Sequence, residues 1–270
     1  MSSLLCAVDF SLGDWTVRFA AVFARVTGSA VLLFHVRERG DGADAAARLA
    51  ALALTLEGTG LAVRTESEQG DPAAVIVRRA AALDASAIVM GTHGGRGLER
   101  LMLGSVAESV LHRAGRPVAT LRGPEHADGP IRKIVCGADL EDPAPLSAAA
   151  ELAHRTSAEL LVVHAVRDLP EEGGHGLVPA SYGPALLEEA RTNLGRAVAF
   201  LGGSSVRFSA RVVPGSPSRA LLRTAGEISA DLLVVGIHPH VVGSTTHPIV
   251  RGASCPVLTV PAGAGGVKTA

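Results

Sequence analysis

The sequence is poor in lysine, and it contains no run of basic residues. Its 270 residues include only two lysines, Lys133 and Lys268, and the formal net charge is −1 at pH 7 with an isoelectric point near 6.8. A nucleic-acid-binding surface usually needs clustered positive charge. The composition therefore gives no electrostatic basis for binding DNA or RNA.

Long apolar segments are missing as well. No stretch reaches the roughly 18 uninterrupted apolar residues that suggest a membrane-spanning helix, and residues 1–10 have no basic region typical of a secretory signal. We therefore expect a cytoplasmic globular protein, with no membrane partner. An apolar content of 47% at 19% charged residues is ample for a large buried core.

Cysteine is scarce, and its spacing does not suggest redox or metal chemistry. Cys6, Cys136 and Cys255 form no C-x-x-C pair, and each lies in an apolar run typical of a strand. Their number is odd. We expect three buried, reduced thiols.

Several sequence signatures of enzymes are also absent. The chain contains no G-K-[ST] of a Walker A loop, no G-x-G-x-x-G after its first strand-like run, and no G-x-S-x-G nucleophile elbow. The segment DFSLGDW at 9–15 is not the glycine- and serine-rich loop typical of nucleotide-transferring α/β enzymes. We predict no catalytic residue.

An internal duplication spans nearly the whole chain. Five segments recur in the same order: LLCAVDF as KIVCGADL, AVLLFHV as ELLVVHAV, GDP as GSP, ASAIVMGTH as SADLLVVGIH, and AGRPVATL as ASCPVLTV. Such ordered self-similarity is typical of tandem repeats. We place the first repeat at residues 1–122 and the second at 131–261, joined by a linker near 122–130.

Within each repeat, short β-branched runs alternate with alanine-rich stretches of helical periodicity. In the first repeat the pattern predicts strands near 3–9, 29–36, 60–67, 87–91 and 117–121, and helices near 13–27, 43–57, 71–84 and 104–114. The strand runs do not alternate in polarity, which favours parallel strands covered by helices on both faces. The predicted fold class is α/β, with two repeated doubly wound parallel five-stranded sheets.

Three dipeptides mark helix starts. Asp71-Pro72, Asp142-Pro143 and Ser216-Pro217 each place a capping side chain before a proline suited to the first helical position.

The segment MGTHGGRGLERLMLGS at 90–105 carries the most specific pattern. Gly91, Gly94, Gly104 and Ser105 are spaced as G-x2-G-x9-G-S between a strand end and a helix start. Glycines let backbone approach a ligand, and the N–H groups at a helix start attract anions, so the pattern suits a polyphosphate. Two alternatives stay open: Arg96 and Arg100 are either phosphate contacts or solvated loop residues, and Ser105 with Glu108 also fits a capping box.

These residues resemble the universal stress proteins, whose nucleotide-binding members carry the same G-x2-G-x9-G-[ST] signature. The resemblance covers nearly the whole chain twice. It includes an aspartate ending the first strand (Asp9, Asp139), a histidine at the second (His35, His164), the GDP-type start of the third helix, and RPV before the fifth strand.

The resemblance implies an ATP ligand, with or without Mg²⁺, held by the first repeat. By similarity, Ala7 and Asp9 line the adenosine pocket, the backbone of Val36 bonds the adenine edge, and Met90 and Gly91 meet the ribose. The implied phosphate contacts are Gly94, Gly104, Ser105 and Val106. It also implies an adenine-nucleotide α-hydrolase-like fold, with strand order 3-2-1-4-5 and pairing of fifth strands, either between protomers of a homodimer or between the two repeats of one chain.

The second repeat departs from this pattern. Only six residues separate Gly236 from Gly243, where twelve separate Gly91 from Gly104, and Pro239 replaces the second glycine. Proline removes a backbone donor and fixes φ. We expect a degenerate loop and a mainly structural role for this repeat.

The histidines allow both structural and functional interpretations. We expect His35 and His164 to be packed and hydrogen-bonded. The trio His238, His240 and His247 is compatible with zinc. However, Pro239 directs the side chains of the first two apart, and no nearby cysteine or carboxylate offers a clear fourth ligand. We predict no metal site there.

The leading hypothesis is a non-catalytic, ATP-binding stress-response protein that acts on an unidentified protein partner. The alternatives are a nucleotide-independent interaction module and an ATPase of low turnover.

Overall fold

A computed structural model describes residues 2–10, 13–37, 44–92, 103–167, 182–237 and 245–263. The first repeat contains each predicted strand and helix, with ends within a few residues of expectation. Its elements are β1 (Ser3–Ala7), α1 (Trp15–Thr27), β2 (Ala30–Arg37), α2 (Ala45–Leu54), β3 (Val63–Gln69), α3 (Pro72–Ala82), β4 (Ala87–Gly91), α4 (Ser105–Arg113) and β5 (Val118–Leu121).

The second repeat follows the same order of elements. They are β6 (Lys133–Gly137), α5 (Ala144–Thr156), β7 (Glu159–Val166), α6 (Tyr182–Val198), the short 3₁₀ helix η1 (Ala199–Gly203), β8 (Arg207–Pro214), α7 (Pro217–Glu227), β9 (Leu232–Ile237), α8 (Thr246–Gly252) and β10 (Val257–Pro261). None of the described helices is long and apolar enough to cross a membrane.

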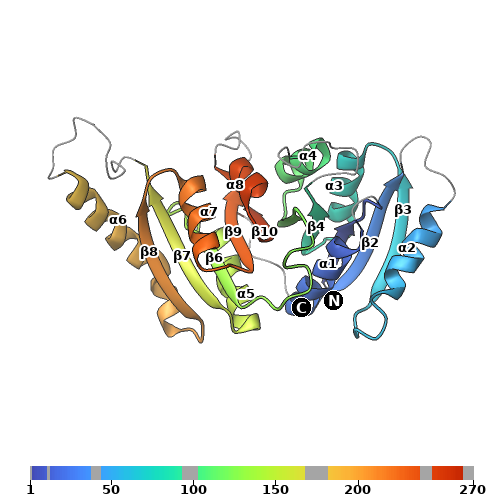
Figure 1. The fold of residues 1–270 in the computed structure, drawn as a ribbon, viewed down its shortest axis with the longest axis horizontal. Helices are drawn as coiled ribbons and strands as arrows, with labels where there is room; N and C mark the ends of the chain where they lie inside the picture. Colours follow the sequence, from blue (N-terminus) through green and yellow to red (C-terminus); the bar gives the residue numbers. More distant parts are fainter. Residues whose placement is uncertain are drawn as a thin grey trace.

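The strands form one ten-stranded sheet with two winding switches. Its order is β3-β2-β1-β4-β5-β10-β9-β6-β7-β8, so each repeat contributes five parallel strands in the order 3-2-1-4-5. The two repeats lie on either side of the molecule (Figure 1). This arrangement confirms the predicted fold class.

The two halves of the sheet meet through their fifth strands. β5 and β10 pair antiparallel, with Val257 opposite Thr120 and Thr259 opposite Val118. The Thr259 hydroxyl donates to the Val118 carbonyl oxygen at 3.1 Å. Of the two pairings that the resemblance left open, the one within the chain is therefore present, and it covers two edges that would otherwise be exposed.

Helices cover both faces of the sheet, and each face has one continuous apolar core that crosses from one repeat into the other. Residues of α1, α2, α5 and α6 pack in one core, and residues of α3, α4, α7 and α8 pack in the other. Strand side chains alternate between them: Leu4 and Cys6 face the first core, and Leu5 faces the second. The parallel strands are thus buried on both sides, as their unbroken apolar runs predicted.

The helix starts agree only partly with the predicted caps. Asp71 caps α3 as expected, accepting a hydrogen bond from the Ala74 N–H at 2.8 Å. Ser216 occupies the cap of α7 without making a side-chain capping bond. The prediction for α5 was wrong by one residue: Pro143 is the N-cap, and Asp142 accepts from the Ala144 N–H at 3.0 Å.

The three cysteines are buried and unpaired, as predicted. Burial raises the pKa of each thiol to about 12, so the reactive thiolate is scarce at neutral pH. We expect a thiol reagent such as DTNB to label none of the three in the native protein and all of them in guanidinium. Rapid labelling of one thiol under native conditions would contradict this.

Candidate functional site

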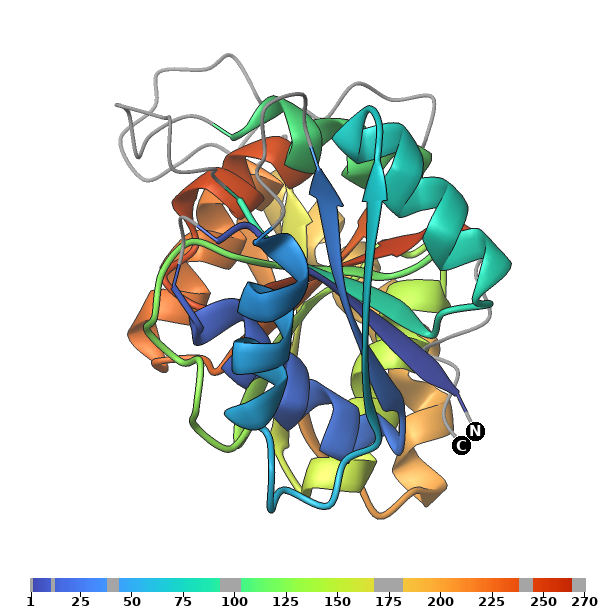
Figure 2. The ribbon, with the colours of Figure 1, turned by 90° about the vertical axis from the view of Figure 1, so that its right-hand side faces the viewer.

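The candidate site lies at the carboxyl edge of the first five strands. β1 pairs with β2 on one side and β4 on the other, so the chain winds in opposite directions from β1. Ligands of doubly wound sheets bind at such a switch point. The arrows of β2 and β3 point towards the end of the molecule where α4 lies (Figure 2).

Five of the predicted site residues end the three strands at this switch. Ala7 ends β1 and Asp9 follows it, Val36 lies near the end of β2, and Met90 and Gly91 end β4. Val36 and Met90 are buried, whereas Ala7 and Gly91 are partly accessible and Asp9 is exposed. The edge thus combines an apolar floor with one accessible carboxylate.

A histidine fixes the shape of this edge. His35 Nδ1 lies 2.9 Å from the Val8 carbonyl oxygen, and its ring contacts Phe10 with centroids 4.3 Å apart. His164 makes the equivalent contact with the Ala138 carbonyl oxygen at 3.1 Å. The interpretation of this pair as packed, hydrogen-bonded histidines is confirmed.

The predicted phosphate loop is closed at its base. The Thr92 N–H donates to the Leu121 carbonyl oxygen at 2.8 Å, and the Gly104 N–H donates to the Thr92 carbonyl oxygen at 2.8 Å. These bonds bring the start of α4 beside the end of β4. Gly94, Arg96 and Arg100 lie outside the described residues, so their predicted contacts remain predictions.

The start of α4 differs from a capping box. The N-cap is Gly104, which has no side chain, and Ser105 is the first helical residue, with its side chain exposed. The N-cap therefore makes no side-chain hydrogen bond to the first turn. The first N–H groups of a helix have no intrahelical partner, and in α4 these belong to residues from Ser105 onwards.

The corresponding edge of the second repeat is built differently. The Thr246 hydroxyl donates to the Gly236 carbonyl oxygen at 3.0 Å, and Arg167 donates to the Thr245 hydroxyl at 3.3 Å. A side chain from the segment after β7 therefore reaches the N-cap of α8. Pro239, Gly243 and Ser244 lie outside the described residues.

A second group of chemically active side chains lies where the repeats meet. Glu108 and His112 on α4 and His247 on α8 each place one donor atom within 4.8 Å of the other two. The sequence grouped His247 with His238 and His240 and did not indicate the cluster of Glu108, His112 and His247. His238 and His240 lie outside the described residues. His247 is 135 residues from His112 in the chain, and it meets the two α4 residues because β5 pairs with β10.

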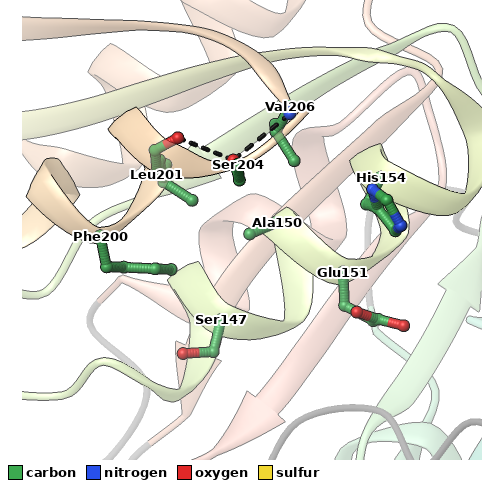
Figure 3. A pocket seen from close by; sticks show the side chains of 8 residues that line it. All are labelled: Ser147, Ala150, Glu151, His154, Phe200, Leu201, Ser204 and Val206. Carbon is green, nitrogen blue, oxygen red and sulfur yellow. Dashed lines mark hydrogen bonds between the residues drawn. The ribbon is translucent and has the colours of Figure 1, made fainter.

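A shallow pocket of about 230 Å³ lies in the second repeat (Figure 3). Residues of α5, including Glu151 and His154, line one side, and Phe200 and Leu201 of η1 line the other. Since α5 runs back from the end of β6 and η1 precedes β8, the pocket lies towards the amino ends of the strands. It is therefore separate from the candidate site.

Comparisons with known proteins agree with this architecture. A model of the Universal stress protein family matches residues 1–122 and 130–261. The crystal structure of a universal stress protein from Archaeoglobus fulgidus superposes with a TM-score of 0.71 at 19% identity, covering 96% of this chain and 98% of that one.

Curated relatives carry the same description. Universal stress protein Rv2005c of Mycobacterium tuberculosis is 31% identical over 193 residues, covering 65% of this chain and 61% of the relative. A universal stress protein of Mycolicibacterium smegmatis is 29% identical over 213 residues, covering 74% of this chain and 69% of the relative. The chain thus spans about three fifths of the first relative and about two thirds of the second.

Proposed function

The chain belongs to the universal stress protein family, and we propose that its first repeat binds one ATP molecule as a regulatory ligand, without catalysing a reaction. In this proposal adenosine lies over Ala7, Asp9, Val36 and Met90, with ribose at Gly91. The phosphates lie at the start of α4, against Gly104, Ser105, Val106 and the predicted loop residue Gly94.

The observation that carries the proposal is the start of α4. Gly104 gives this helix an N-cap without a side chain, so no carboxylate or hydroxyl of the cap competes for its first N–H groups. The Gly104–Thr92 hydrogen bond holds that end of the helix beside β4. A phosphate group placed there would accept those N–H donors and be stabilised by the helix dipole.

The features of the second repeat support a stoichiometry of one ATP molecule per chain. Its loop is six residues shorter between the corresponding glycines, and its predicted second glycine is Pro239. The Arg167–Thr245 hydrogen bond also occupies the approach to α8. We therefore assign the second repeat a structural role, in which it completes the sheet beside β5.

The proposal is tested by what the protein carries when it is purified without added nucleotide. We expect ATP in the supernatant after denaturation, identified by chromatography and approaching one equivalent per chain. Protein that neither releases ATP nor binds it on titration would overturn the proposal in favour of a nucleotide-independent interaction module. Phosphate release that scales with protein concentration would instead indicate an ATPase of low turnover.

A further inference from the structure

We propose that Glu108, His112 and His247 form a binding site for a transition-metal ion of the zinc class, which links the two repeats. The three side chains come from helices on opposite sides of the β5–β10 junction. Such a site uses none of the residues proposed for the nucleotide, although Glu108 lies in the same first turn of α4 as Ser105 and Val106.

The positions of these residues follow from the duplication. Glu108 lies ten residues before Val118, and His247 lies ten residues before Val257, so they occupy equivalent places in the two repeats. The antiparallel pairing of β5 with β10 brings these equivalent places together. Figure 1 shows α4 and α8 next to one another at the middle of the molecule.

The contacts within the cluster bring two imidazole nitrogens together and leave a carboxylate close by. His112 Nε2 and His247 Nε2 lie 2.9 Å apart, whereas Glu108 Oε1 faces the other ring nitrogen of His247, Nδ1, at 3.6 Å. An ion held by both Nε2 atoms therefore needs the Glu108 side chain to turn towards it, and one ligand atom of each residue already lies within 4.8 Å of the other two. Zinc–nitrogen bonds of about 2.0–2.1 Å at a tetrahedral angle require nitrogens about 3.3 Å apart. The two imidazoles would need to separate by only a few tenths of an ångström to admit the ion.

The donor chemistry selects the class of metal. Two imidazoles and one carboxylate suit zinc and its neighbours, whereas Mg²⁺ prefers oxygen ligands alone. Three protein ligands leave a fourth tetrahedral position for water. Glu108 and His112 are four residues apart on α4, which places them on one face of the helix.

The cluster is partly sheltered from solvent. The His247 side chain is 18% exposed and that of Glu108 is 49% exposed. Glu108 places a negative charge beside His247, and Arg251 places a positive charge near it. The negative charge of Glu108 offsets the repulsion that Arg251 exerts on a cation.

Zinc titration of the metal-stripped, nucleotide-free full chain tests this site. We expect one Zn²⁺ per chain by calorimetry, and a rise in the melting temperature because the ion links α4 to α8. His112→Ala and His247→Ala should each weaken binding at least tenfold. His154→Ala is the matched control and should bind as the parent, because His154 lies on α5 and hydrogen-bonds Ser205 instead.

Two further variants keep the test decisive. Glu108→Gln alters a side chain that is 49% exposed, so the fold should tolerate it, and we expect weaker zinc binding with an unchanged melting temperature in the absence of metal. The double variant His238→Ala/His240→Ala should retain the parent affinity. The proposal is overturned if the parent binds no zinc, if Glu108→Gln and both single histidine variants bind as the parent, or if only the double variant loses binding.

Discussion

Replacing Leu258 with aspartate should lower the free energy of unfolding of the whole chain by more than about 4 kcal/mol. Leu258 is fully buried in β10, opposite Ala119 of β5 and beside Val234 of β9. An aspartate there would bury an unpaired carboxylate and remove a large apolar side chain at the junction of the repeats.

The milder Leu258→Ala should cost about 2–5 kcal/mol, because it leaves a cavity where the surrounding core cannot fully collapse. The matched control is Leu54→Asp, at a leucine that is 60% exposed, and we expect a change below about 1 kcal/mol. Chemical denaturation followed by circular dichroism measures all three variants.

The shape of the unfolding curve also tests whether the two repeats are coupled through their junction. Both apolar cores run through both repeats, so we expect the parent to unfold in one cooperative transition that shifts as a whole in the Leu258 variants. Two separate transitions, of which only one responds to Leu258→Ala, would show that the repeats are independent.

Local sequence patterns predicted most of this fold because each pattern reports a buried surface. Runs such as Leu32-Leu33-Phe34 indicate strands covered on both faces, and the repetition of the pattern indicates two equivalent units. Pairing of the fifth strands was implied by the family resemblance, which left pairing within the chain and pairing between protomers open. The need to cover sheet edges does not by itself select β5 and β10, because β3 and β8 remain edge strands.

The least accurate strand was β3, placed near 60–67 but observed at Val63–Gln69. It lies at the edge of the sheet and is largely polar, with the sequence VRTESEQ. An edge strand buries little, so the apolar residues before it were a poor guide to where it begins.

The site could be predicted only in part. The residues that end β1, β2 and β4 meet at one edge because parallel strands end together. The glycine motif marked Gly91, and the family resemblance implied the others. Glu108, His112 and His247 could not be grouped in this way, because no local pattern joins residues from different repeats. Their proximity depends on the register of β5 against β10.

Gly104→Leu should weaken ATP binding at least tenfold, or about 1.4 kcal/mol, by placing a side chain where we propose that the phosphates lie. The fold should survive, because Gly104 has φ −63° and ψ 143°, a conformation that any residue adopts. Unchanged circular dichroism and an unchanged melting temperature without ATP would establish this.

Gly243→Leu is the matched control in the second repeat. Gly243 lies 14 residues before Val257, just as Gly104 lies 14 residues before Val118. If the second repeat does not bind the nucleotide, the same side chain at this equivalent position should leave ATP affinity within about twofold of the parent.

The most direct measurement of the central claim is isothermal titration calorimetry of ATP into the nucleotide-free parent, Gly104→Leu and Gly243→Leu. We predict one ATP per chain in the parent and in Gly243→Leu, and a dissociation constant at least tenfold higher in Gly104→Leu. Two equivalent sites in the parent, or loss of ATP binding only in Gly243→Leu, would contradict the assignment of the nucleotide to the first repeat.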